Sequence, residues 1–315
     1  MPSTITILGP NGHVGHAAAK AFAAAGWQVT GFGRANRKPV KGIAFNAGDA
    51  ADTAQVRAAI GTADVVFNGL NLPYHKWFGG AAEAQLEAVL TALKGSGKTL
   101  LFPGNVYNYA ASARAIAPDT PQHPETPRGA VRMRMESRLR QAAETEDFQA
   151  IVLRAGDFYG PGSDNDWFDL MILREVAKGR IALPTRKPVR HAWAYLPDLA
   201  DAFVALAERR SELGRHESFH FAGHAVTADD LYAAIENAAG RSLKRTDFPW
   251  RMLGAIGLAM PMIREVVKMR YLWDNEMVLT DPWLAAILGE DFGTPFTAAI
   301  AATVAPVFTQ IRAAA

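Results

Sequence analysis

Short apolar runs alternate with longer amphipathic segments through the first half of the chain. Runs of this length, nearly continuous in apolar residues, are typical of strands that are covered on both faces of a sheet. Six runs are predicted as strands: Thr4–Leu8, Trp27–Phe32, Gly42–Asn46, Asp64–Asn68, Lys98–Phe102 and Phe148–Leu153. Helical segments such as Gly80–Lys94 and Gly129–Glu146 lie between them. The alternation predicts right-handed crossovers and an α/β fold with a Rossmann-type, doubly wound parallel sheet.

From Ser163 onward this alternation changes. The elements expected there are helices over Trp167–Lys178, Asp198–Arg209 (capped by Asp198) and Asp229–Ala239, and extended segments over Arg190–Tyr195 and Glu217–Phe221. The last part is expected to be mainly helical and broken by prolines at 249, 261, 282 and 295. We therefore expect a dinucleotide-binding Rossmann domain at residues 1–162 plus 190–223. Residues 163–189 plus 224–315 would form a smaller, mainly helical substrate-side lobe.

The composition is that of an ordinary soluble globular protein. The 315 residues are 49% hydrophobic and 20% charged with a net charge of +2, so neither a nucleic-acid nor a membrane partner is indicated. The sequence contains no cysteine, which excludes disulfides, thiol catalysis and zinc–thiolate sites and fits a cytoplasmic protein. We expect no signal peptide, because the first strand begins almost at the N-terminus.

Two apolar stretches lie towards the C-terminal end. Met252–Ile263 is well short of the ~20 residues that a membrane span needs, and Phe292–Ile311 is interrupted by Pro295 and Pro306. Both are expected to pack inside the folded protein. A hydrophobic partner surface at Met252–Ile263 stays open as an alternative.

The first predicted strand runs directly into a turn in which Gly9, Gly12 and Gly15 are three residues apart. In a strand–turn–helix unit the first glycine makes the turn, the second lets a phosphate approach the main chain, and the third lets helix and strand pack closely. Free N–H groups at the helix start would bind the pyrophosphate of a dinucleotide. Predicted cofactor contacts here are Gly9, Asn11, Gly12, His13, Val14 and Gly15. An ordinary turn without a ligand is the alternative.

Basic residues follow the second predicted strand, where this architecture meets the adenosine ribose. An acidic residue at that place would bind the ribose hydroxyls and repel a 2′-phosphate, but the chain has Arg34, then Arg37 and Lys38. Guanidinium and ammonium groups suit a phosphate dianion, so NADP is favoured over NAD. A solvated basic loop is the alternative. Asp49 is placed either to accept from the adenine amino group or to cap the next helix.

Further candidates follow the fourth predicted strand. Asn68, Gly69 and Leu70 would border the cofactor, and the aromatic loop with Tyr74, His75 and Trp77 would form a wall of the substrate site. Packing of Tyr74 and Trp77 against the following helix is an equal alternative. Most of the charge on Gly129–Glu146, which includes Arg132, is expected on a solvated helix face.

Several motifs together resemble the extended short-chain dehydrogenase/reductase family, which includes sugar-nucleotide epimerases and dehydratases, over almost the whole chain. They are Gly9–Gly15, Val106-Tyr107, Leu153-Arg154 through Tyr159-Gly160-Pro161-Gly162, Ala192–Ala200 and the closing segment from Thr294 to Val304. The resemblance implies further cofactor contacts at Pro103, Gly104, Asn105, Arg132, Gly156 and Phe158. It implies substrate contacts at Arg128, Tyr159 and Trp193. A homodimer through the helix that holds Arg132 and the helix before it is also implied.

The chemistry of that family depends on a Ser or Thr after the fifth strand and on a Tyr-x-x-x-Lys pair, which moves a proton while hydride moves. Alignment places Pro103, Arg128 and Arg132 at these three positions, and no tyrosine of the chain is followed by lysine four residues later. Arginine stays protonated, so Arg128 cannot replace the tyrosine as a proton carrier. His75, Tyr107 and Asp157 are the remaining candidates. Their alternatives are a surface loop, a core hydroxyl and a turn.

The histidines at 216, 220 and 224 do not predict a metal site, because the strand pattern around them and a break before His224 keep them from converging. Three functions stay open. The first is an atypical NADP-dependent oxidoreductase or epimerase for a small carbonyl, hydroxyl or sugar-like substrate. The second is a non-catalytic NADP-binding sensor or scaffold. The third is an anion-binding protein that uses Arg128 and Arg132 and has a vestigial nucleotide site.

Overall fold

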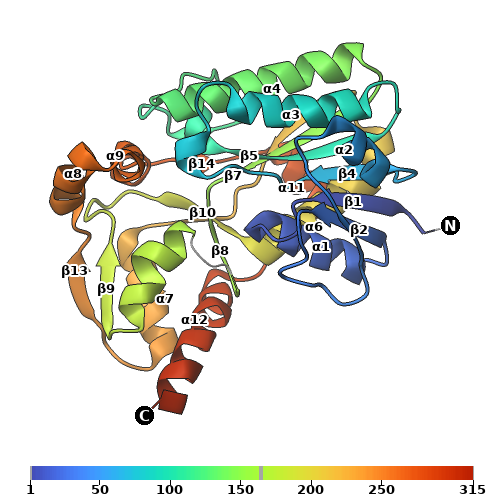
Figure 1. Cartoon of the computed structure of the whole chain (residues 1–315). Helices are drawn as coiled ribbons and strands as arrows, with labels where there is room; N and C mark the ends of the chain where they lie inside the picture. The colour runs from blue at the N-terminus through green and yellow to red at the C-terminus, as the bar shows by residue number, and fades with distance from the viewer. Residues whose placement is uncertain (1, 163–165, 315) are drawn as a thin grey trace.

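A seven-stranded parallel sheet forms the centre of the larger part of the molecule. The computed structural model describes residues 2–162 and 166–314, and Figure 1 shows the whole chain. The strand order is β11-β7-β5-β4-β1-β2-β3, and every neighbouring pair is parallel. The strands are β1 (Thr4–Leu8), β2 (Gln28–Gly33), β3 (Ala44–Ala47), β4 (Val65–Asn68), β5 (Thr99–Asn105), β7 (Gln149–Ala155) and β11 (His216–His220). The predicted Rossmann-type sheet is confirmed, and its order reverses between β1 and β4, where such sheets bind ligands.

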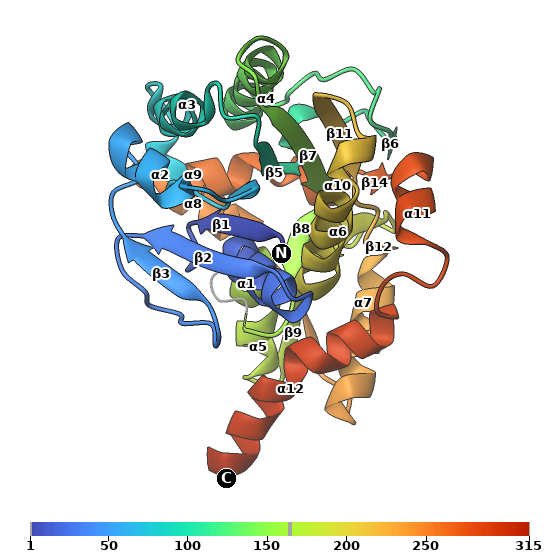
Figure 2. The same ribbon diagram turned by 90° about the vertical axis from the view of Figure 1, so that its right-hand side faces the viewer.

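Helices cover both faces of this sheet, as Figures 1 and 2 show. One face carries α1 (His13–Ala24), α6 (Leu196–Glu208) and α11 (Pro282–Leu288), which contribute Phe22, Phe203 and Leu284 to one apolar core. The other face carries α2 (Thr53–Ile60), α3 (Ala81–Leu93) and α4 (Pro127–Thr145). Burial on both faces explains why the central strands β1, β4, β5 and β7 are nearly continuous apolar runs.

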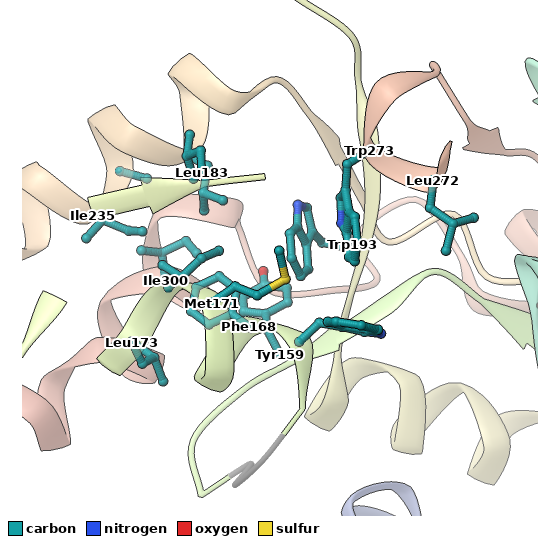
Figure 3. Close-up of a cluster of buried hydrophobic side chains, with 14 of the residues drawn as sticks. Tyr159, Phe168, Met171, Leu173, Leu183, Trp193, Ile235, Leu272, Trp273 and Ile300 are labelled. Carbon is teal, nitrogen blue, oxygen red and sulfur yellow. The ribbon is translucent and has the colours of Figure 1, made fainter. Parts of the chain in front are cut away.

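A second apolar core lies beside the sheet and includes the residues drawn in Figure 3. Three small sheets border it: β8 (Asp157–Tyr159), β10 (His191–Tyr195) and β12 (His224–Val226); β9 (Arg180–Leu183) and β13 (Lys244–Asp247); β6 (Ala115–Ile116) and β14 (Val278–Leu279). Its helices are η3 (Asp169–Leu173), α5 (Arg174–Val176), α7 (Ala228–Ala239), α8 (Trp250–Ala259), α9 (Pro261–Lys268), α10 (Tyr271–Asp274) and α12 (Phe296–Ala314). Short helical turns are η1 (Tyr74–Lys76), η2 (Val106–Asn108) and η4 (Arg210–Glu212). The division of the chain into the two expected domains stays a prediction.

One local expectation, the Asp198 cap, and one of the two alternatives for Asp49 are wrong. Asp198 does not cap α6, which begins at Leu196; its carboxylate instead accepts hydrogen bonds from the backbone N–H and the hydroxyl of Thr294. Asp49 does not cap α2, because Asp52 accepts the free backbone N–H groups there. Most of the charge over Gly129–Glu146 is solvated, as expected, since Arg134, Arg140 and Glu144 are exposed, but Arg132 and Glu136 are buried.

The apolar stretch Met252–Ile263 forms α8 and the start of α9, and it is only partly packed inside. Trp250 and Gly257 are buried, but Leu258 is 85% exposed and Met252, Met260 and Met262 are also exposed, which contradicts the expectation of full packing. Within residues 2–162 and 166–314, no helix combines the length and the apolar character that crossing a bilayer requires.

Candidate functional site

The glycine turn between β1 and α1 has the tight geometry that its spacing predicted. Gly9 has a φ of +79°, and a Cβ at that position would lie 2.9 Å from the carbonyl oxygen of Gly69 at the end of β4. A Cβ on Gly15 would lie 2.3 Å from the carbonyl oxygen of Gly9. Both glycines are therefore required by the packing of the protein itself, whether or not a ligand is bound.

Gly12 differs from its neighbours. It is exposed at the N-cap of α1, and a Cβ there would meet no atom of the described protein closer than 3.6 Å. No side chain caps this helix, so the backbone N–H groups of its first turn receive no hydrogen bond from a capping side chain. The protein does not need a glycine here for its own packing, and its absent Cβ leaves room beside these N–H groups, which is the arrangement in which a helix N-terminus binds phosphate. We call this feature the cradle at Gly12.

The basic loop after β2 is fastened to this turn by Asn11. The Asn11 side chain donates to the carbonyl oxygen of Ala35 (2.6 Å) and accepts the backbone N–H groups of Arg37 (2.8 Å) and Lys38 (3.0 Å). The side chain of Asn11 is thus used within the protein, so only its backbone is left for a cofactor. Arg34 is exposed at the end of β2 and forms no ion pair within the described residues.

The ends of β4 and β5 border the same crevice. Asn68 accepts the backbone N–H of Leu70, which shapes the turn that places Gly69 against Gly15. On β5, the carbonyl oxygen of Pro103 accepts a hydrogen bond from the Arg132 guanidinium of α4. In the family these two positions carry the hydroxyl of a Ser or Thr and the ammonium group of a Lys. Here they are joined by a hydrogen bond from the Arg132 side chain to the main chain of Pro103.

The ring of Trp77 faces two of the arginines of α4, Arg128 and Arg132. Its ring centroid is 5.8 Å from the Arg128 guanidinium carbon and 5.9 Å from that of Arg132, and its indole N–H donates to the carbonyl oxygen of Leu72. Trp77 is only 3% exposed, so the packing alternative describes it better than an open substrate wall does. Arg128 is fully buried and lies 3.8 Å from Glu265 of α9, which closes over this cluster.

The other predicted substrate residues are also mostly inside the protein. Tyr159 and Trp193 belong to the core in Figure 3, and the Tyr159 hydroxyl lies 2.7 Å from Nδ1 of His224. Burial raises the pKa of Tyr159, with Asp198 and Tyr195 adding to the shift. His75 is exposed, and Tyr107 is buried in η2. The side chain of Tyr74 lies outside the described residues.

A buried polar network joins β7, α4 and β11. Arg154 forms two hydrogen bonds with Glu136 (2.9 and 2.7 Å), and its Nε donates to Nε2 of His220 (3.2 Å). Burial alone would raise the pKa of Glu136, but the charge and hydrogen bonds of Arg154 outweigh it and hold the pKa below its usual range. For His220, burial and then the charge of Arg154 lower the pKa to about 4. Sequence analysis missed this network; its one signal was an arginine within an otherwise apolar strand.

Asp157, which directly follows β7 and Gly156, pairs with His191 of β10. The Nε2 of His191 lies 3.0 Å from Oδ2 of Asp157, and its Nδ1 lies 3.1 Å from the carbonyl oxygen of Leu272. Of the proposed proton carriers, Asp157 is thus the one held in a buried acid–base pair. Gly156 permits this arrangement, because a Cβ there would lie 2.1 Å from the carbonyl oxygen of Ala192. His191 was not identified from the sequence.

The histidines at 216, 220 and 224 lie in β11 and β12, and each of the last two is used in a hydrogen-bond network. In the part of the chain that the structure describes, no group of three His, Cys, Asp or Glu side chains is arranged to hold a metal ion.

Comparison with known proteins identifies the family. The model of the NAD dependent epimerase/dehydratase family matches residues 5–221, whereas no curated protein matches the sequence. Similar solved structures are a UDP-glucose 4-epimerase (TM-score 0.78, 15% identity, 98% of each chain covered) and a putative epimerase from Burkholderia cenocepacia J2315 (0.76, 17%, 98% of each). A UDP-glucose 4-epimerase from Brucella ovis in complex with NAD is also similar (0.77, 17%, 97% of this chain and 98% of the other). These likenesses establish the fold, and the family model covers more than half of the chain. The chain therefore belongs to the NAD dependent epimerase/dehydratase family.

Proposed function

We propose that this protein is an NADP-dependent oxidoreductase or epimerase that acts on a small carbonyl, hydroxyl or sugar-like substrate without the Tyr-x-x-x-Lys pair. The observation that carries the proposal is the cradle at Gly12, which lies next to a basic loop that Asn11 fastens to the same turn. The main-chain N–H groups of the first turn of α1 would hold the pyrophosphate. Arg34, with Arg37 and Lys38 nearby, would bind the 2′-phosphate.

The solved relatives named above include one in complex with NAD, and NAD is the alternative cofactor. The choice between the two depends on the residue at the end of β2, because an acidic side chain there repels a 2′-phosphate and a guanidinium attracts it. Arg34 favours NADP on this ground. Asp49 would accept from the adenine, and the ends of β4, β5 and β7 would line the nicotinamide half, at Asn68, Gly69, Leu70, Pro103, Gly104, Asn105, Arg132, Gly156 and Phe158. When bound, the reduced dinucleotide supplies a hydride.

A nucleotide-dependent sensor or scaffold is the second candidate function. It is supported by the buried cluster of Trp77, Arg128 and Arg132, in which the two arginines stand at the positions of the family's tyrosine and lysine. In this function NADP(H) would bind without redox chemistry and would change the affinity for a protein partner. A homodimer through α3 and α4 and a cytoplasmic location are further parts of the proposal.

Steady-state assays separate the two functions. NADPH oxidation is followed with a broad panel of small aldehydes, ketones and sugar-like carbonyls, and nucleotide binding is measured on the same preparation. Turnover with any carbonyl supports the enzyme and excludes the sensor. Tight NADPH binding with no turnover across the panel supports the sensor instead, and no nucleotide binding contradicts both.

A further inference from the structure

The hydrogen-bond geometry of His191 fixes the number of protons in its pair with Asp157. A backbone carbonyl oxygen can only accept, so the contact with Leu272 requires a hydrogen on Nδ1 of His191. A neutral imidazole carries one N–H only, and its Nε2 would then be an acceptor facing a carboxylate oxygen at 3.0 Å. Two acceptors do not attract each other, so a second proton must lie between Nε2 and Oδ2. The pair therefore holds one proton more than a neutral imidazole and a carboxylate.

His220 provides a comparison within the same chain. Its Nδ1 also faces a backbone carbonyl oxygen, that of Ile116 at 3.0 Å, but its Nε2 faces the hydroxyl of Tyr109 (3.1 Å) and the Nε–H of Arg154 (3.2 Å). Arg154 can only donate, so Nε2 of His220 must be an acceptor and this imidazole is neutral. Two buried histidines with the same Nδ1 contact thus differ in their protonation because different groups face Nε2.

The place of the pair in the fold is suited to proton transfer. Ala155, at the end of β7, is in register with Asn105 of β5, so Asp157 lies just beyond the carboxyl edge of the sheet, where ligands bind in this fold. Side chains alternate along β8, so Asp157 faces away from the side of Phe158 and towards the second core. The side chains of Asp157 and His191 are 5% and 11% exposed, so the pair is largely shielded from bulk water but retains some solvent contact.

Aromatic rings enclose the pair and limit its access to water. The ring of His191 lies 4.8 Å from that of Trp193 and 5.9 Å from that of Trp273. The titratable group from another element that interacts with Asp157 is Tyr271 of α10, on which the exposed Glu125 also acts. Burial raises the pKa of Tyr271, and the charges of Glu125 and Asp157 add to the rise, so this phenol stays protonated.

We propose that the Asp157–His191 pair stores the proton for this site in place of the missing tyrosine, and that Asp157 transfers it to the oxygen of a substrate carbonyl. The inference rests on the proposed oxidoreductase function. As hydride adds to the carbonyl carbon, the π electron pair moves to the oxygen, and the stored proton forms the new O–H bond. The pair is left as a carboxylate beside a neutral imidazole, and a proton from solvent restores it. Each carbonyl reduced thus consumes one hydride and one proton.

Nuclear magnetic resonance of the full chain with 15N-labelled histidine tests the stored proton without any ligand. At pH 7 we expect both ring nitrogens of His191 to be protonated, while Nε2 of His220 is not; His191→Gln assigns the His191 signals. In Asp157→Asn the side-chain amide can donate to Nε2, so His191 should become neutral and lose the Nε2 proton. An unprotonated Nε2 in the wild type, or the same state in wild type and Asp157→Asn, would overturn the proposal.

Steady-state kinetics test the proton transfer, with NADPH and a carbonyl compound that the wild type reduces. Asp157→Asn should lower kcat by about 100-fold or more, as loss of a general acid does, with KM little changed. His191→Gln can still donate to Asp157 but cannot titrate, so it should alter the shape of the pH profile of kcat, which a purely structural role would not. Wild-type kcat in folded Asp157→Asn would refute the proton transfer. Absence of turnover in the wild type would refute the oxidoreductase function and the transfer step, whereas the magnetic resonance result would still decide whether the pair stores a proton.

Discussion

The side-chain oxygen of Asn11 accepts the backbone N–H of Arg37 over 2.8 Å. This contact joins the turn that would hold a pyrophosphate to the loop that would hold a 2′-phosphate, although the two segments belong to different strand ends. The distance between the two proposed phosphate sites is therefore set by the protein before any nucleotide arrives. Such preorganisation lowers the cost of ordering the loop on binding.

Replacing Asn11 by alanine should weaken NADPH binding more than NADH binding. The substitution removes three hydrogen bonds, and at about 0.5–1.5 kcal/mol each in a partly exposed site we expect roughly a tenfold rise in the Kd for NADPH. Isothermal titration with both nucleotides measures this. Asn237→Ala, at an exposed position of α7, is the matched control and should leave both affinities unchanged. An equal loss for NADH would show that the loop does not contact the 2′-phosphate.

The glycine turn predicts that two similar substitutions have opposite consequences. Gly12→Ala should fold with nearly wild-type stability, because the new Cβ meets no protein atom closer than 3.6 Å, but it should bind nucleotide at least tenfold more weakly. Gly15→Ala places its Cβ 2.3 Å from a backbone oxygen and should lower the free energy of unfolding by about 1–3 kcal/mol. Thermal unfolding and nucleotide titration of each variant test the pair. Unchanged nucleotide binding in Gly12→Ala would mean that the cradle is not used.

The sheet and the glycine turn could be predicted from the sequence because their signals are local. Apolar runs such as Asp64–Asn68 and the spacing of Gly9, Gly12 and Gly15 are contained within a few residues, and burial on both faces makes the strands easy to recognise. The strands β6 and β14 have two residues each and are far apart in the sequence, so no local pattern indicates their pairing.

The partners of buried charged residues could not be predicted either, because they are far from those residues in the sequence. Asp198 precedes a helical segment and resembles a cap, but its partner Thr294 is 96 residues away. Glu136 resembles one more charge on a solvated helix until α4 packs on the sheet and brings it to Arg154. Of the Asp157–His191 pair, only Asp157 was predicted, because it lies within a recognisable motif. His191 could not be predicted, because it lies on a separate strand, β10, which pairs with β8 only in the folded protein.

Glu136→Gln should destabilise the protein strongly, because it leaves the buried guanidinium of Arg154 beside a neutral partner. We expect a loss of about 3 kcal/mol at pH 7. The folded-state pKa of Glu136 lies below its usual value of 4.5, so the stability that this group contributes is present above about pH 4.5 and is lost as the pH falls towards the lowered pKa. Urea unfolding between pH 7 and pH 3 should therefore show a shallower acid dependence in the variant. The exposed Glu144→Gln on the same helix should behave as wild type.

The lowered pKa of His220 predicts that the free energy of unfolding also depends on pH in a second, higher pH range. Its pKa is lowered from 6.5 to about 4, so the unfolded chain binds this proton at a pH where the folded protein does not. Stability should fall as the pH decreases from 6.5 to 4, by about 3 kcal/mol in total. His220→Gln should remove this slope, measured as the free energy of unfolding at pH 7, 5.5 and 4.5. His75→Gln, at an exposed position of η1, is the control; an unchanged slope in His220→Gln would contradict the assignment.

We propose that the turn at Gly9–Gly15 and the basic loop after it form an NADP site. Calorimetric titration of the wild type and of Arg34→Glu with NADPH and NADH tests it most directly. We expect the wild type to bind NADPH more tightly, and we expect the variant to prefer NADH because a carboxylate at this position repels the 2′-phosphate. Tighter binding of NADH by the wild type, or the same preference in both proteins, would contradict the account.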